Sequence, residues 1–129
     1  MKRSTLLLIL PILFLISSCE KREYVTPNRT IIVNLGSGSW ISSNGGKTYT
    51  AAIDMPEIDG YFNENGAVLV YASFGSNIYE QVPEVYNGIA YSFTHRVGQV
   101  ALEIQASDGK TVITPPGSVK IKVVLVESY

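Results

Sequence analysis

The feature that most constrains the fold of this chain is an alternation of side-chain character in short runs. In residues 119–126, Lys120 and Lys122 alternate with valine and isoleucine before the run becomes wholly apolar at Val124. Because successive side chains of a strand point to opposite faces of a sheet, this alternation predicts a strand with one polar and one apolar face. Its apolar continuation predicts that both faces are covered at that end, as in a sandwich core.

Other segments show the same alternation, and turn-forming pairs such as Asn65-Gly66 and Asn87-Gly88 separate them. The segments that predict strands are residues 30–35, 48–53, 67–74, 89–95 and 100–104. Asn and Gly tolerate the positive φ of tight turns, so we expect short antiparallel connections. The fold class predicted is all-β, an antiparallel β-sandwich of about seven or eight strands. A small β-barrel stays open as the alternative, because strand number and alternation do not separate the two.

Residues 56–63 have a spacing that favours a helical turn between two of these strands. Pro56 suits the first position of a helix, and Ile58 and Phe62 are one helical turn apart.

The N-terminal segment has the composition of a cleaved secretory signal. Lys2 and Arg3 are positively charged, residues 6–16 are uncharged and mostly apolar, and two serines follow. This apolar stretch is too short for a transmembrane helix, which needs about 20 residues. We therefore expect export from the cytoplasm and no membrane-spanning helix.

The sequence Ile16-Ser17-Ser18-Cys19 resembles the lipobox of bacterial lipoproteins. That resemblance implies cleavage before Cys19, diacylglycerol on its thiol, and an acyl chain such as palmitate on the new amino terminus. It predicts a lipoprotein signal peptide at 1–18, a lipidated cysteine and tether at 19–28, and a β-sandwich domain at 29–129. The alternative for Cys19 is a small buried side chain of a core strand.

Sorting signals of bacterial lipoproteins also suggest which membrane would hold the protein. An Asp directly after the lipidated cysteine favours retention in the inner membrane of Gram-negative bacteria, whereas Glu20 stands there in this chain. The resemblance implies the outer membrane, with the periplasmic or surface-exposed face left open. The charged run 20–23 loosely resembles surface-export signals of some Bacteroidota lipoproteins and is equally compatible with a solvated spacer.

Several segments of the chain resemble a group of small Bacteroidota outer-membrane lipoproteins whose function is uncharacterised. They are residues 65–71, the Val82-Pro83 pair, Tyr91-Ser92-Phe93 and residues 119–126. The resemblance implies an all-β domain on a lipid anchor, and it implies no activity.

Catalytic and nucleic-acid-binding residues are sparse in this sequence. The net charge is −1 and the basic residues are scattered, whereas nucleic-acid-binding domains carry clustered basic residues. His95 is the only histidine, and residues 36–39 lack the strand-to-helix setting of a nucleophilic serine. We therefore expect neither an enzyme, a cofactor nor a nucleic-acid partner.

Residues 54–66 concentrate acidic and amide side chains, which are the ligands that Ca²⁺ prefers. An EF-hand is excluded, because aligning Gly66 with the turn glycine of that motif would place Tyr61 and Ala72 at carboxylate positions. A solvated acidic connection is the favoured interpretation and an irregular calcium loop the alternative, so no metal site is predicted.

Aromatic side chains are the best candidates for ligand binding. The chain has eight tyrosines and one tryptophan, and we expect Trp40, Tyr79 and Tyr86 to be exposed because they lie near predicted turns. The favoured interpretation of the tyrosine content is nevertheless that tyrosine suits half-buried strand positions, with its ring in the core and its hydroxyl in water. The functional prediction is a non-catalytic envelope module that binds a glycan, a peptide or a partner protein. The alternative function is a structural spacer or assembly subunit that pairs through an exposed strand edge.

Overall fold

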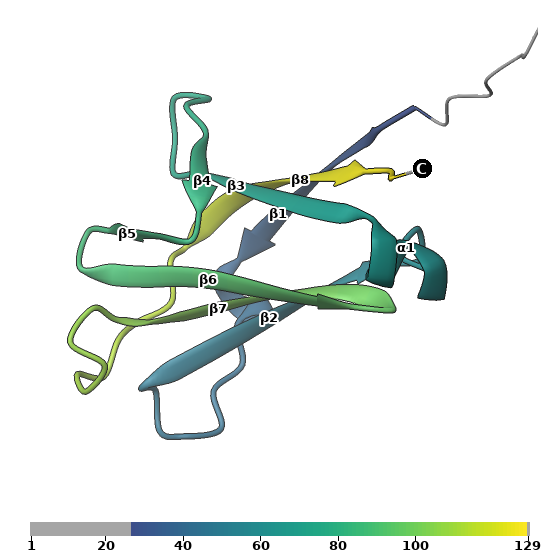
Figure 1. Ribbon diagram of the computed structural model, residues 1–129. Coiled ribbons are helices and arrows are strands. Elements are labelled where there is room, and N and C mark those ends of the chain that lie inside the picture. The colour runs from purple at the N-terminus through teal and green to yellow at the C-terminus, as the bar shows by residue number, and fades with distance from the viewer. Residues whose placement is uncertain (1–26, 129) are drawn as a thin grey trace, which may run out of the picture.

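Two antiparallel sheets of four strands each face one another across residues 27–128, which are the residues that the computed structural model describes (Figure 1). Sheet A has the order β1-β8-β3-β4, and sheet B has the order β2-β7-β6-β5. The strands are β1 (Arg29–Gly36), β2 (Thr48–Met55), β3 (Ala67–Ser73), β4 (Glu80–Val82), β5 (Glu84–Tyr86), β6 (Ile89–Arg96), β7 (Gly98–Ala106) and β8 (Ser118–Val126). The predicted sandwich is confirmed, and within this range the sheets do not close into a barrel.

The alternating pattern of the sequence buries one face of each sheet against the other. On β8 the inward side chains of Val119, Ile121, Val123 and Leu125 are at most 1% exposed. Val100, Leu102 and Ile104 of β7, on the opposite sheet, are fully buried. Each large aliphatic side chain buried in this way contributes about 1.5 to 3 kcal/mol, so the two central strands form the centre of the core.

The outer face of sheet A differs from the prediction for the end of β8. Val124 and Val126 point away from the core and are only half-buried, and Ile32 on the neighbouring strand β1 is 54% exposed. No second layer covers this face among the described residues. The expectation that both faces of residues 124–126 are covered is therefore wrong: the apolar run is longer than the core needs.

Of the four connections along which the chain passes between the sheets, two lie side by side. β1 pairs with β8 while β2 pairs with β7, so the β1–β2 and β7–β8 connections run together. Backbone hydrogen bonds join them, from Ser37 N to Gly117 O at 3.1 Å and from Ile113 N to Gly46 O at 3.0 Å. Gly46 has a φ of 89°, and a Cβ there would lie 3.0 Å from the Val112 side chain. Glycine is therefore required where the two connections approach.

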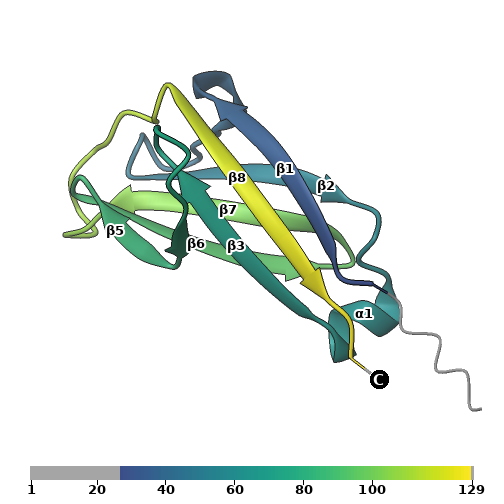
Figure 2. The same ribbon diagram turned by 90° about the horizontal axis from the view of Figure 1, so that it is seen from above.

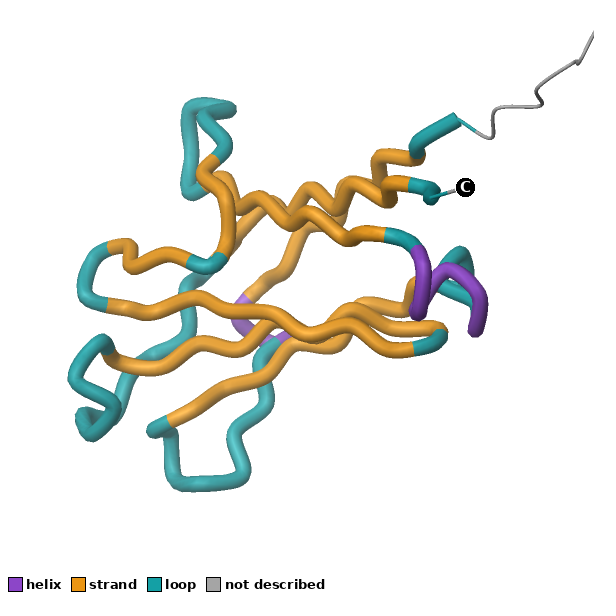
Figure 3. Tube along the Cα trace, in the orientation of Figure 1, coloured by secondary structure: helices purple, strands orange, loops and turns teal. Residues whose placement is uncertain are grey.

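The strand directions divide the sandwich into two ends (Figures 1 and 3). The loop end carries the connections at residues 37–47, 74–79, 87–88 and 107–117. The helix end carries the start of β1, the end of β8, the β6–β7 turn and the helix α1 (Gly60–Asn65). Seen from above, the strands of sheet A run obliquely over those of sheet B (Figure 2), as twisted sheets do when they pack face to face.

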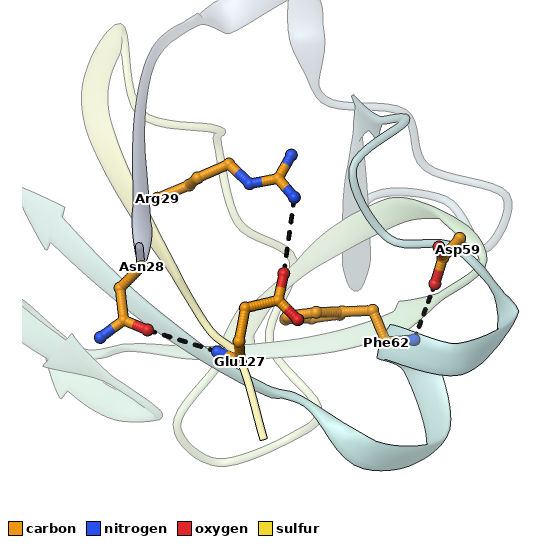
Figure 4. Close-up of polar contacts among 5 residues, drawn as sticks. All are labelled: Asn28, Arg29, Asp59, Phe62 and Glu127. Carbon is orange, nitrogen blue, oxygen red and sulfur yellow. Dashed lines mark hydrogen bonds and ion pairs between the residues drawn. The ribbon is translucent and has the colours of Figure 1, made fainter. Parts of the chain in front are cut away.

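The helix α1 begins later than the sequence predicts. Asp59, and not a residue near Pro56, caps it, because its carboxylate accepts a hydrogen bond from Phe62 N at 2.8 Å (Figure 4). Such a side-chain acceptor satisfies one of the free amides at a helix start. Ile58 and Phe62 are both buried in the core, although the predicted helix boundaries are wrong.

Strands β4 and β5 are not predicted by the alternation pattern. Each has three residues, which is too short for a recognisable period of two. Pro83 stands between them, at the point where the chain passes from sheet A to sheet B. Proline has no backbone N–H to donate, so a break in pairing at this residue leaves no donor unsatisfied.

Two isoleucines on neighbouring strands test the assignment of faces. Ile121→Ala removes a fully buried side chain of β8 and should lower the free energy of unfolding by about 2 to 5 kcal/mol. Ile32→Ala on β1 is the matched control and should change it by less than about 1 kcal/mol, because its side chain is already exposed. Urea denaturation of the full-length chain in a neutral detergent measures both. Equal losses in the free energy of unfolding would contradict the assignment of Ile121 to the inner face and of Ile32 to the outer face.

Candidate functional site

The β3–β4 loop, residues 74–79, has the most unusual backbone of the described chain. Gly75, Ser76 and Asn77 follow one another with φ values of 141°, 57° and 52°. Non-glycine residues rarely adopt the left-handed region, and each costs of the order of 1 kcal/mol or more unless its surroundings compensate. Ile78, at the tip, is 66% exposed. A loop held in such a conformation and projecting from a rigid sheet is the kind of segment on which binding residues are found.

The first hollow beside this loop is polar, and a lysine side chain is part of its lining. It has a volume of about 290 Å³ and is lined by Asn34, Ser118 and Lys120 from sheet A and by residues 73–77 above them. Lys120 Nζ donates to Asn77 Oδ1 at 3.1 Å, which ties the loop to β8. We call this site the lysine hollow; its volume is slightly below the range of small-ligand sites, which begins near 300 Å³.

A second lysine continues this surface along the same strand. Lys122 lies two residues after Lys120, so both side chains point to the outer face of sheet A. Its Nζ atom lies 4.1 Å from the ring centroid of Tyr79 and 4.6 Å from that of Tyr71. Aromatic rings attract an ammonium group through their negative faces, and they carry no charge that could neutralise it.

The outer face of sheet A is cationic in a chain whose net charge is −1. Residues that alternate with the core residues on β1, β3, β4 and β8 include these two lysines and, within the described range, no carboxylate. The outer face of sheet B carries Asp54 and Glu103 together with Arg96. Among residues 27–128 the ion pair found is Arg29–Glu127 at 3.4 Å, so neither lysine is neutralised by an acidic neighbour.

The second hollow lies on the other side of the β3–β4 loop and is more apolar. Its volume is about 310 Å³, and its lining includes Phe74, Ile78, Glu80 and Tyr86. The Tyr86 ring stacks parallel to Phe74 with 3.9 Å between centroids, and Tyr91 meets Phe74 edge-on at 5.1 Å. Phe74 therefore joins the two sheets at the loop end and leaves Tyr86 partly exposed.

One oxygen of a carboxyl group in this neighbourhood is shielded from water. Glu84 Oε1 is buried and has no hydrogen-bond partner in the described structure. Burial, and then the charge of Glu80, raises the pKa of Glu84 above its ordinary value. Burial also raises the pKa of Tyr91 to about 12, with Glu84 and Tyr86 adding to the effect, so Tyr91 stays neutral at physiological pH.

The three predicted aromatic residues have different surroundings. The expected exposure of Trp40 is wrong: it is 5% exposed and belongs to the core, because the 3-10 turn Ser37–Ser39 brings its ring between the sheets. Tyr79 is half-buried beside Lys122, and Tyr86 is 41% exposed in the second hollow. The structure places the two tyrosines on the two sides of the β3–β4 loop and leaves Trp40 inaccessible to a ligand.

Other sequence candidates lie apart from this loop. His95 Nδ1 lies 3.1 Å from Asn63 Oδ1 at the helix end. Within residues 27–128 no group of three or more histidine, cysteine or acidic side chains is placed to hold a metal ion, and Asp59 of the acidic segment 54–66 caps α1. Cys19 and its cleavage region at Ile16, Ser17 and Ser18 lie outside the described residues.

Sequence reasoning missed the two lysines as site residues. Their alternation with the core residues of β8 is visible in the sequence, but their isolation from carboxylates is not. That property depends on which strands flank β8, and sheet order is not encoded in a local pattern.

Comparison with family models, with curated proteins and with solved structures gives no match to this chain. Residues 27–128 contain no helix with the length and apolar character needed to cross a membrane.

The raised pKa of Glu84 predicts an unusual pH dependence of stability. A raised pKa means that the folded state binds more protons than the unfolded state from about pH 4.5 upwards, so wild-type stability should fall as the pH rises through that range. Glu84→Gln cannot ionise and should gain stability relative to wild type between about pH 4 and pH 7.

Urea denaturation at several pH values measures this difference. Glu103→Gln is the control for removing one negative charge, because Glu103 is exposed on the outer face of sheet B. If the difference in the free energy of unfolding between Glu84→Gln and wild type does not change with pH, the pKa of Glu84 is not raised in the folded state.

Proposed function

We propose that this chain is a lipid-anchored lipoprotein of the bacterial outer membrane whose β-sandwich is a non-catalytic binding module. The positively charged start, the apolar stretch and the Ile16–Cys19 sequence support the anchor, together with the resemblance to small Bacteroidota lipoproteins. Cys19 carries the lipid and residues 19–28 form the tether. Stable anchoring follows when two or more acyl chains enter the bilayer, since a single chain binds only marginally.

The single observation that carries the binding role is the separation of the two ends of the sandwich. Asn28 and Arg29 lie at the helix end, where Asn28 Oδ1 accepts a hydrogen bond from Glu127 N at 3.3 Å and Arg29 contacts the Glu127 carboxylate at 3.4 Å (Figure 4). The tether enters the domain at this point. The β3–β4 loop and its two hollows lie towards the loop end, so a lipid anchor would leave them accessible.

The tether would also keep the domain near its membrane. Each residue of an extended chain spans at most about 3.3 to 3.6 Å, so the eight residues 20–27 span at most about 26 to 29 Å. This length is comparable with the thickness of the hydrocarbon layer, which is about 30 Å. The binding surface would therefore meet molecules that belong to, or pass close to, the envelope. His95, the only histidine of the chain, lines a separate hollow at the helix end and neither of the two hollows beside the β3–β4 loop, which favours binding over acid–base catalysis at that loop.

The alternative role, assembly through a strand edge, has one favourable observation. β1 is an eight-residue edge strand of sheet A with an exposed Ile32, whereas the edge strand β2 of sheet B is partly covered where Ile41 pairs with Thr50. Unpaired backbone groups at such an edge can accept a strand from a partner. Capture of one stoichiometric protein partner that is lost on Ile32→Lys would favour this role over ligand binding.

The anchor is tested at Cys19. Cys19→Ala removes the thiol that would carry the diacylglycerol, so we expect loss of labelled palmitate and release of the protein from the membrane fraction. Ser17→Ala keeps a small residue in the cleavage region and should behave as wild type. Membrane association of Cys19→Ala together with an unlabelled wild-type chain would refute the anchor.

A further inference from the structure

We propose that the outer face of sheet A, from the lysine hollow to Lys122, binds an acidic glycan, meaning a saccharide chain that carries carboxylate or phosphate groups. This inference rests on the proposed binding role and names its ligand class and its site. The site consists of Lys120 and Lys122 of β8, Asn34 of β1, Ser118 and the side chains of Asn77 and Tyr79 in the β3–β4 loop.

Charge complementarity indicates an anionic ligand. Both lysines lie on a face whose described residues include no carboxylate, and their partners are an amide oxygen and two aromatic rings. These neutral partners orient the ammonium groups without cancelling their charge. Hydrogen bonds between an ammonium group and an anionic oxygen are stronger than those between neutral groups, so an incoming anion would gain from both lysines.

The two lysines occupy successive outward positions of β8. Residues two apart on a strand are separated by about 6.5 to 7 Å along its axis, and Lys120 and Lys122 occupy such positions on β8. β8 is a central strand, flanked by β1 and β3, so its backbone fixes the spacing of the two Cα atoms. A ligand with repeated negative charges along its length would engage both lysines.

The hydrogen-bonding groups favour a saccharide over a peptide. Asn34 and Ser118 are exposed beside Lys120 and offer an amide and a hydroxyl, which match the hydroxyl groups of a sugar. β8, which carries both lysines, is paired with β1 on one side and with β3 on the other, so a peptide cannot add as a strand beside the lysines; the free edge of this sheet lies on β1, one strand away. Recognition at the two lysines must therefore use side chains.

The β3–β4 loop closes the site on one side. Asn77 contacts Lys120 and Tyr79 contacts Lys122, so the left-handed backbone at Ser76 and Asn77 positions both contacts over β8. A site held by a fixed loop and a central strand loses little freedom when a ligand binds. The conformation of the loop thereby has a role in binding.

The experiment uses the full-length chain in a neutral detergent and measures binding of fluorescently labelled oligogalacturonate. Oligogalactose is the uncharged match, and a phosphorylated oligosaccharide distinguishes phosphate from carboxylate as the source of the charge. We expect binding of one or both acidic saccharides, weakened by salt, and no binding of oligogalactose. The variant Lys120→Gln/Lys122→Gln should bind at least about tenfold more weakly.

Matched variants separate the site from net charge and from folding. Lys47→Gln/Lys110→Gln removes two exposed lysines elsewhere at the loop end and should leave the affinity within about twofold of wild type. Lys120→Arg/Lys122→Arg keeps both charges and should retain binding, which shows that the face still folds. Tyr79→Ala should weaken binding by removing the ring beside Lys122.

Several results would overturn the inference. One is an equal loss of saccharide affinity in the two double glutamine variants. Another is tighter binding of poly-glutamate, or of vesicles containing phosphatidylglycerol, than of either acidic saccharide. A third is no saccharide binding by a folded protein. If the folded protein binds no saccharide but still incorporates palmitate at Cys19, the ligand class is refuted and the lipid anchor is not. Saccharide binding by a chain that incorporates no palmitate would refute the anchor alone.

Discussion

Burial of alternate side chains of β8 between the two sheets is the interaction on which the rest of the structure depends. Val119, Ile121, Val123 and Leu125 fill the middle of the core, and β8 pairs with β1 on one side and β3 on the other. Because the period of a strand is two, placing these residues inside places the lysines between them outside. A shift of pairing by one residue would bury two ammonium groups, so the core and the cationic face are determined together.

The β3–β4 loop connects this face to the second hollow. Its left-handed residues, its tie to Lys120 and the stacking of Phe74 on Tyr86 hold it between sheet A and the end of β5. Loop and hollows lie away from the residues through which a lipid tether would enter the domain. The proposed anchor and the proposed binding face are therefore compatible in one molecule, although they rest on different parts of the chain.

Sequence patterns predicted the long strands well and the short or irregular elements poorly. Each predicted long strand is present with boundaries that differ by one or two residues, because the alternation between core and solvent continues for most of its length. Strands β4 and β5 are too short to show a period, and Asp59 moved the start of α1 by forming a cap. Trp40 lies near a turn in sequence, but the turn directs its ring into the core.

The sequence by itself determined which side chains of each strand face inward, where the chain turns, and the segment that resembles a lipoprotein signal. These properties depend on neighbouring residues, whose spacing is imposed by backbone geometry. Only the tertiary structure decided that Lys122 lies between Tyr71 and Tyr79 and that Lys120 lines a hollow without an acidic neighbour. Those contacts join segments about 40 to 50 residues apart, and they form because the packing of the two sheets selects the order of the strands.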